Sequence, residues 1–300
     1  METRPLGATG YDVTRLGYGS MGLRGPKTWG SRVVSDLDAE RVLNAVIDAG
    51  INFIDTAPDY GVSEERIGRF LSNRRHEFYI ATKCGCDPVQ HEDQLEVRHK
   101  WTPDVVRRNV QQSLQRLQTD YIDLLQFHGG DAKSLQSSGL IDLMHEFLEQ
   151  GLIRHFGVSS SLPELTELIE LGVFATYQIP YSCLAPEHKP LIERAASTGA
   201  GIIIRGGIAR GGPDAAIQRA ETNAIWEEAR LDDFLSGQMT RAQLILRHTL
   251  SNPHVDTIIV GTCDLQHLEE NITALNEGPL PEEIVAAIDE RVHALLQSTS

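Results

Sequence analysis

Short apolar runs alternate with segments whose apolar residues recur at the period of a helix, and this alternation limits the folds open to the chain. Each run has the length of a buried strand. A strand followed by a helix, repeated along one chain, favours a closed parallel barrel over an open sheet. The predicted strands are Leu16–Gly19, Asn52–Asp55, Phe78–Lys83, Ile122–Phe127, Ile153–Val158, Ala175–Gln178, Gly201–Ile204 and Thr257–Val260.

The segments between the runs carry start and stop signals of helices. Ser63 is expected to open one helix as its N-cap, with acidic residues beside it at the positive end of the helix dipole. Ser161 and Glu164 have the spacing of a capping box, and Gly172 is expected to end the helix that follows.

Two pieces lie outside the repeat. Residues 1–15 are expected to form a hairpin that closes one end of the barrel, and residues 281–297 an additional C-terminal helix. The fold class is therefore α/β, a (β/α)8 TIM barrel, and residues 1–300 are interpreted as one domain. The competing Rossmann sheet is rejected: GYGSMG at 17–22 matches G-x-G-x-x-G by letter, but no helix pattern follows it.

The net charge of the chain excludes some classes of binding partner. A formal net charge of −15 argues against nucleic acid and against an anionic membrane surface. No apolar run approaches the roughly 18 residues that span a bilayer, and METRPLGATG has no signal-peptide core. The cysteines form no C-x-x-C pair and no zinc-type spacing with histidine, so no metal site is predicted and a cytoplasmic location with reduced thiols is expected.

Chemically capable side chains follow three neighbouring strands. Asp55 ends the second strand and Tyr60 lies in its loop, while Lys83 and His128 end the third and fourth. In a parallel barrel these ends meet at one rim. An ammonium beside a phenol is expected to lower the pKa of the phenol, a carboxylate can hold that ammonium, and a histidine can orient a substrate oxygen. Together they predict a general acid.

Each residue also has an ordinary explanation. Asp55 can serve as a loop acceptor, Tyr60 can pack, Lys83 can extend its amine to solvent, and His128 can bond a backbone carbonyl. Four such residues on adjacent strand ends are harder to explain by coincidence.

The chain resembles the aldo-keto reductase family from end to end. The resemblance rests on GINFIDTAPDYGVSEERIG, IATKCG and DLLQFHGG. It implies an oxidoreductase that moves a hydride between a nicotinamide cofactor and an aldehyde or ketone, or the corresponding alcohol. It also implies Tyr60 as proton donor, Lys83 and Asp55 as the pair that tunes it, and His128 as the substrate orienter.

The resemblance implies cofactor contacts as well. NADP(H) is favoured and NAD(H) stays open, because 262–267 holds no lysine or arginine and Asp264 would repel a 2′-phosphate. The glycines after the seventh strand predict a loose loop that approaches phosphates. The expected cofactor-binding residues are Gly19, Ser20, Met21, Asp55, Ser159, Gln178, Arg205, Gly206, Gly207, Ile208, Ala209, Gly211, Gly261, Thr262, Asp264, His267, Glu270 and Asn271.

Two other functions are alternatives on a barrel of this kind. A nucleotide-binding regulatory subunit on the same barrel would turn over slowly or not at all. A lyase that uses Lys83 as a Schiff base would need a neutral amine, which Asp55 opposes. Trp29 and Trp101 lie in rim loops and either wall the substrate pocket or simply pack there. The individual carbonyl substrate, the direction of reaction and the oligomeric state stay open.

Overall fold

Eight parallel strands close into a barrel, as the fold prediction required. The computed structural model describes residues 1–28, 33–92, 94–209 and 220–298. Neighbouring strands pair in chain order, and the last strand pairs with the first, so the ring has no open edge. The strands are β3 (Leu16–Gly19), β4 (Phe53–Asp55), β5 (Tyr79–Cys84), β8 (Ile122–His128), β9 (Ile153–Ser159), β10 (Thr176–Pro180), β11 (Gly201–Arg205) and β12 (Thr257–Val260).

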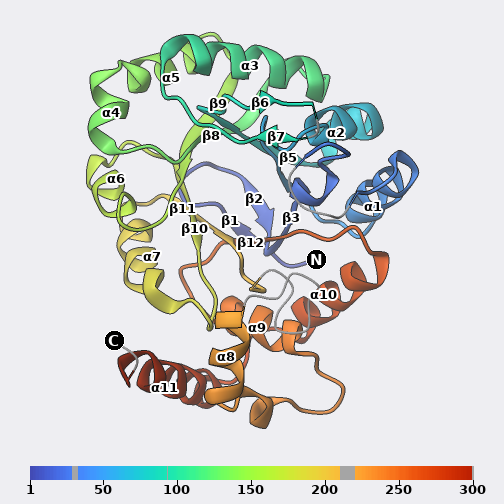
Figure 1. Cartoon of the computed structure of the whole chain (residues 1–300), viewed down its shortest axis with the longest axis vertical. Coiled ribbons are helices and arrows are strands. Elements are labelled where there is room, and N and C mark those ends of the chain that lie inside the picture. The colour runs from blue at the N-terminus through green and yellow to red at the C-terminus, as the bar shows by residue number, and fades with distance from the viewer. Residues whose placement is uncertain (29–32, 93, 210–219, 299–300) are drawn as a thin grey trace.

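Helices surround the ring on its outside (Figure 1). They are α1 (Asp36–Asp48), α2 (Ser63–Leu71), α3 (Pro103–Leu117), α4 (Ala132–Ser137), α5 (Leu140–Glu149), α6 (Leu165–Leu171), α7 (Lys189–Ala196), α8 (Ala220–Glu228), α9 (Arg241–Leu250), α10 (Leu265–Glu277) and α11 (Glu282–Ser298). Short 3-10 helices cover Ser20–Leu23, Ser72–Glu77, Pro186–His188 and Leu231–Phe234.

The main core lies between the barrel strands and the apolar faces of the outer helices. Val42, Leu43 and Val46 of α1 are fully buried there, as are Ile54 of β4 and Ile80 of β5. Each such side chain contributes about 1.5–3 kcal/mol when it leaves water. This packing fixes the strand ends in place, and with them the side chains at the rim.

The N-terminal hairpin closes one end of the barrel, as predicted. β1 (Thr3–Pro5) pairs with β2 (Asp12–Thr14), and Figure 1 shows both strands within the ring of helices. Leu6 and Val13 are buried against strand residues such as Phe53, deep in the barrel. The rim at the opposite end, where the strands finish, is thereby left for a functional site.

The C-terminal helix is also present. α11 covers the predicted segment and packs its buried Ile288 and Val292 against a second apolar cluster. That cluster is centred on Trp226 of α8, which is 0% exposed.

Two predicted helix caps are wrong, although α2 begins at Ser63 as expected. Ser63 is the first helical residue of α2, not its cap: Val62 holds the N-cap position, and the Ser63 hydroxyl is directed at Ser20, to whose Oγ it donates at 2.8 Å. α6 begins at Leu165, with Glu164 in the N-cap position and no side-chain cap, because residues 162–164 form a turn that separates Ser161 from the helix. Gly172 ends α6 with a φ of 62°, as expected.

The connection 84–101 contains a hairpin that sequence analysis missed. β6 (Val89–Gln90) pairs with β7 (Leu95–Glu96), and below them Cys86 and His99 form a further antiparallel bridge. Alternation over two residues is too short to predict a strand. The hairpin matters because it places the side chains of Cys86 and His99 at the rim.

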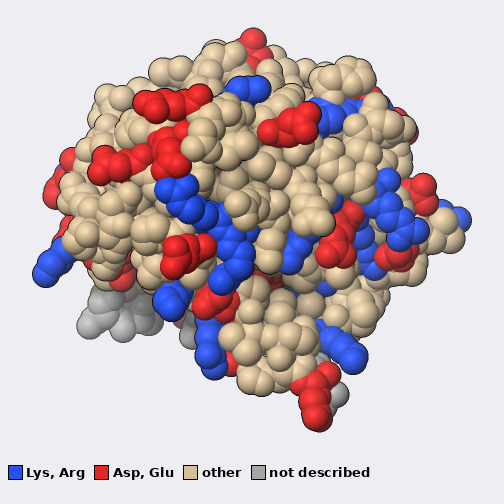
Figure 2. Space-filling view, turned by 90° about the horizontal axis from the view of Figure 1, so that it is seen from above, with Lys and Arg blue, Asp and Glu red and all other residues tan. Residues whose placement is uncertain are grey.

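The surface is mixed in charge on the face that Figure 2 shows, where many Lys and Arg side chains lie next to Asp and Glu. Among the ion pairs of the described residues, Arg74 contacts both Asp48 and Glu77. Within the described ranges, no helix combines the length and apolar character that a membrane span requires. All four cysteines are free thiols, and three of them are buried.

Candidate active site

Two glycines frame the stretch 50–61, which leads into the rim. Gly50 follows α1 with a φ of 82°, a conformation that ends a helix readily only for glycine. Gly61 has a φ of 55°, and a Cβ at this position would lie 2.1 Å from the carbonyl oxygen of Arg24. Both ends of the stretch are therefore tightly constrained, and so are the acid and the phenol between them.

Asp55 and Lys83 form a buried ion pair. The Lys83 Nζ–Asp55 Oδ1 distance is 2.7 Å, and the two side chains are 1% and 2% exposed. Lys83 Nζ also donates to the carbonyl oxygen of Thr56 at 2.8 Å. Burial opposes the charge on Lys83, but Asp55 and Tyr60 outweigh it and raise the lysine pKa. A protonated amine cannot attack a carbonyl, which argues against the Schiff-base lyase.

The second oxygen of Asp55 is held from across the barrel. Gln178 Nε2 on β10 donates to Asp55 Oδ2 at 2.7 Å, and Gln126 Nε2 on β8 donates to the same oxygen at 3.1 Å. β4 and β10 are four places apart in the ring of eight, so the first of these bonds crosses the interior. Gln126 was not predicted, and its only sequence signal is a polar residue inside the apolar run IDLLQFH.

Tyr60 lies beside Lys83. The Lys83 nitrogen is 5.1 Å from the centre of the Tyr60 ring. Burial raises the pKa of the phenol to about 12, although the charge of Lys83 and its hydrogen bond act to lower it. The prediction of a lowered pKa is therefore wrong for the free protein, because desolvation outweighs the ammonium. The hydroxyl keeps its proton at neutral pH, as a proton donor requires.

His128 completes the group at the end of β8. Its ring lies edge-on to that of Tyr60, with centres 6.2 Å apart. Burial lowers the pKa of the imidazole, in opposition to Asp59, whose Oδ2 is 3.1 Å from His128 Nδ1. The structure thus brings Asp55, Tyr60, Lys83 and His128 to one rim, a set that can donate a proton and stabilise charge on an oxygen.

Ser159 and Gln178 lie next to this group. They are directly opposite each other on the paired strands β9 and β10. Both are buried, and Ser159 Oγ donates to Gln178 Oε1 at 2.8 Å. Each oxygen keeps a lone pair, and the Gln178 amide keeps a second N–H. These remaining acceptors and this remaining donor match the N–H and C=O groups of a nicotinamide carboxamide. The residues present therefore suit a nicotinamide ring.

The predicted loop after β11 is partly described. Arg205 ends the strand, and a Cβ built at Gly206 meets nothing within 4 Å, so this backbone borders open space. Gly207 is packed, not loose, because a Cβ there would lie 2.4 Å from Ile258. Ile208 and Ala209 complete the turn, and Ala209 N donates to the Gly206 carbonyl oxygen at 2.8 Å. Gly211 lies outside the described residues.

The turn between β12 and α10 is built by Thr262 and Asp264. Thr262 Oγ1 accepts from Asp264 N at 3.0 Å, and the Asp264 carboxylate caps α10 by accepting from Gln266 N at 2.9 Å. Further along α10, Glu270 accepts from Gln266 Nε2 at 2.9 Å. The remaining predicted residues of this region are Gly261 and His267, which are exposed, and Asn271, which is buried.

The predicted residues after β3 differ in role. Gly19 is half-buried at the strand end, next to Gly261. Ser20 is fully buried and its hydroxyl bonds Ser63, so its side chain ties the 3-10 helix after β3 to α2. Met21 is 39% exposed.

Of the two tryptophans predicted in the rim loops, the structure describes Trp101. Trp101 stacks on His99, with ring centres 5.9 Å apart and planes at 17°. This contact favours packing as its role. Trp29 lies outside the described residues.

The barrel and its rim match one family of enzymes. The family model of the aldo/keto reductase family matches residues 15–292. The chain belongs to the aldo/keto reductase family. It is therefore an oxidoreductase that uses a nicotinamide cofactor.

Individual relatives agree with this assignment. Oxidoreductase YqkF of Bacillus subtilis is 29% identical over 96% of this chain and 95% of its own. The NADH-specific methylglyoxal reductase of Escherichia coli is 26% identical over 92% and 94%. The holo form of aldo-keto reductase AKR11C1 from Bacillus halodurans is 27% identical over 97% and 96%, with a TM-score of 0.84.

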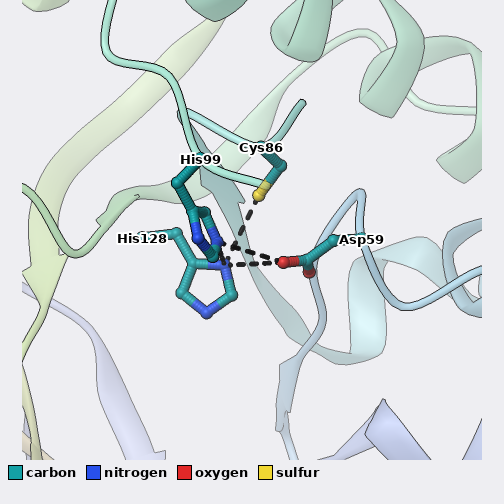
Figure 3. Close-up of side chains that lie close together, drawn as sticks. All are labelled: Asp59, Cys86, His99 and His128. Atoms are coloured by element: carbon teal, nitrogen blue, oxygen red, sulfur yellow. Dashed lines mark hydrogen bonds and ion pairs between the residues drawn. The ribbon is translucent and has the colours of Figure 1, made fainter. Parts of the chain in front are cut away.

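This aldo-keto reductase also has a cluster of four side chains beside its rim, which sequence analysis did not identify (Figure 3). Asp59, Cys86, His99 and His128 point toward one another, and one donor atom from each lies within 4.8 Å of the others. Burial disfavours the Asp59 charge, but hydrogen bonds from His128 and His99 hold the carboxyl pKa well below its usual range. The four residues are far apart in the sequence, so no local pattern indicates the cluster. The hairpin that brings His99 inward was also not predicted.

Proposed function

We propose that this enzyme reduces an aldehyde or ketone, with Tyr60 as proton donor and Asp55, Lys83 and His128 as its supporting groups. The observation that carries the proposal is the buried Asp55–Lys83 pair at 2.7 Å, with the Lys83 nitrogen 5.1 Å from the centre of the Tyr60 ring. When bound, the nicotinamide supplies the hydride that adds to the carbonyl carbon. Residues 1–300 act as one domain in this proposal.

The chain's own residues handle the proton. The substrate oxygen gains negative charge as its carbon is reduced, and the Tyr60 hydroxyl donates a proton to it. Lys83 stabilises the phenolate that remains, and Asp55 keeps the lysine charged and in position. His128 presents its second ring nitrogen for a hydrogen bond to the same oxygen.

A coupled binding and turnover assay tests this proposal. Tryptophan fluorescence would follow binding of NADPH and of NADH, and 4-nitrobenzaldehyde would then be added while the absorbance of the reduced cofactor is recorded. Loss of absorbance is expected. Tight binding without turnover across a panel of aldehydes and ketones would instead favour the regulatory subunit.

For the cofactor, we infer that the enzyme accepts both NADPH and NADH. We also infer that the Asp264 carboxylate lowers the preference for NADPH by repelling its 2′-phosphate. The family resemblance favours NADP(H), whereas the segment 261–271 contains no lysine or arginine that would pair with a 2′-phosphate. The E. coli relative is NADH-specific by name, which fits the same interpretation. The Asp264 carboxylate at the start of α10 adds a negative charge where an anion would otherwise be favoured.

Asp264→Asn is expected to raise kcat/KM for NADPH relative to NADH. Asparagine still caps a helix, so the charge is removed while the fold is kept. One charge at a solvent-facing site is worth on the order of 1 kcal/mol, or about five-fold in the ratio. Steady-state kinetics with both cofactors would measure it.

Glu277→Gln is the matched control, because it removes the same charge from the last residue of the same helix. The ratio should not change there. An unchanged ratio in Asp264→Asn, or an equal change in both variants, would show that Asp264 does not select the cofactor.

A further inference from the structure

Four potential metal ligands meet on the outer side of His128. Asp59 and Cys86 are almost fully buried, with the Asp59 side chain 1% exposed and Cys86 0% exposed. The side chains of His99 and His128 are 26% and 21% exposed. Figure 3 shows the four side chains pointing toward one another, from the loop after β4, the connection 84–101 and the end of β8.

The Nδ1 atom of His128 has more neighbours than it can bond. Asp59 Oδ2 and His99 Nε2 both lie 3.1 Å from it, and Cys86 Sγ lies 3.4 Å from it. A ring nitrogen carries either one proton or one lone pair, so it can form one good hydrogen bond. Hydrogen bonds to Asp59 account for one contact of each histidine, but they leave the approach of Cys86 Sγ and of the two ring nitrogens to each other without a partner role, whereas a cation at the centre would contact all four atoms.

The spacing of the atoms is that of a tetrahedral zinc site. Zinc binds nitrogen and oxygen at about 2.0–2.2 Å and sulfur at about 2.3 Å, so ligand atoms at the corners of a tetrahedron lie roughly 3.3–3.6 Å apart. The cluster has separations of 3.1 Å for His128–Asp59, 3.2 Å for His99–Asp59 and 3.4 Å for His128–Cys86. The His99–His128 separation is 3.1 Å, and all four atoms lie within 4.8 Å of one another, so the wider pairs would draw in around an ion.

The backbone holds the ligands in advance. Asn109 bonds both polar groups of the Cys86 backbone, at 3.0 Å to its nitrogen and 2.9 Å to its oxygen. Cys86 and His99 face each other in an antiparallel bridge, and Trp101 stacks on the His99 ring. A preorganised site loses little entropy when an ion binds.

The charges also balance. A thiolate and a carboxylate together neutralise a divalent ion, and two neutral imidazoles complete the shell. The positive charge of Lys83, on the catalytic side of His128, is already paired with Asp55 at 2.7 Å. Asp59 meets the two histidines through Oδ2, and its second oxygen, Oδ1, is buried without a hydrogen-bond partner among the described residues.

We propose that Asp59, Cys86, His99 and His128 bind one zinc-type divalent ion in a closed, four-coordinate site. Ligation through Nδ1 would fix the other nitrogen of His128, Nε2, as an N–H donor. That nitrogen points away from the cluster in Figure 3. Its use as a donor to the substrate oxygen rests on the proposed function, whereas the metal site itself does not.

Metal binding can be measured without any assay of activity. The purified full-length protein would be analysed for zinc, stripped with a chelator such as dipicolinate, and titrated with Co²⁺ alone. Tetrahedral cobalt with a thiolate ligand gives intense visible bands and a sulfur-to-metal charge-transfer band. We expect these bands to saturate at about one Co²⁺ per chain, and Zn²⁺ to remove them. Wild-type protein that holds no zinc and develops no such bands would overturn the site.

Variants locate the ion. Cys86→Ser should remove the charge-transfer band, and His99→Gln, at a partly exposed position, should weaken Co²⁺ binding at least tenfold. Cys183→Ala is the control, because Cys183 is buried in the separate cluster around Trp226 and should leave the titration unchanged. Equal binding by all three variants would place the ion elsewhere and refute the proposal. A chain that reduces aldehydes yet binds no metal would refute this site alone and leave the proposed function intact.

Discussion

Tyr60→Phe is expected to lower the turnover of carbonyl reduction by about 10²- to 10⁴-fold, the usual contribution of a positioned proton donor. The hydroxyl is the one group this substitution removes, and the ring remains against Lys83 and His128. Stopped-flow and steady-state rates with a single aldehyde would measure the loss in kcat. Cofactor binding, followed by fluorescence, should stay within about two-fold of the wild-type value, since no cofactor contact is assigned to this hydroxyl.

The control for this substitution lies at the other end of the barrel. Tyr11 belongs to the N-terminal hairpin region and stacks on Tyr79 with ring centres 4.2 Å apart. Tyr11→Phe removes the same atom far from the rim and should leave turnover unchanged. Equal turnover in Tyr60→Phe and wild type would exclude Tyr60 as the proton donor.

Much of the barrel could be predicted because a parallel barrel has a strong local signal. Its strands are buried on both faces, so each appears as an unbroken apolar run, and all eight predicted strands overlap observed ones. The wrong predictions of helix caps lie where tertiary contacts, and not local sequence, determine the structure. Ser63 is a plausible cap by sequence, but Val62 holds the cap position and the Ser63 hydroxyl donates to Ser20 on a neighbouring element, a contact that no local pattern reveals.

The four catalytic candidates could be predicted to share one rim because topology alone decides which strand ends are neighbours. Their environment could not be predicted. The pKa of Tyr60 depends on how much burial competes with Lys83, and burial follows from loop packing. The partners of His128 come from a loop and a hairpin whose paths are not encoded in any periodicity, so Asp59, Cys86 and His99 were missed.

Lys83→Met is expected to have a double effect. Turnover should fall by an amount similar to that of Tyr60→Phe, because the phenolate loses the charge that stabilises it. Stability should also fall, by about 3–5 kcal/mol, because Asp55 stays buried without its counter-ion. Denaturant unfolding monitored by circular dichroism would measure the second effect.

The double variant Asp55→Asn/Lys83→Met separates these effects. Asparagine removes the stranded charge while its oxygen can still accept from Gln178, which now donates to Asp55 at 2.7 Å. Much of the lost stability should therefore return, since an unpaired buried charge costs more than a neutral polar group. Turnover should stay low, because no ammonium remains beside Tyr60. If the double variant recovered turnover together with stability, Lys83 would be only the structural counter-ion of Asp55, and the phenol would reach its reactive state without help from a neighbouring cation.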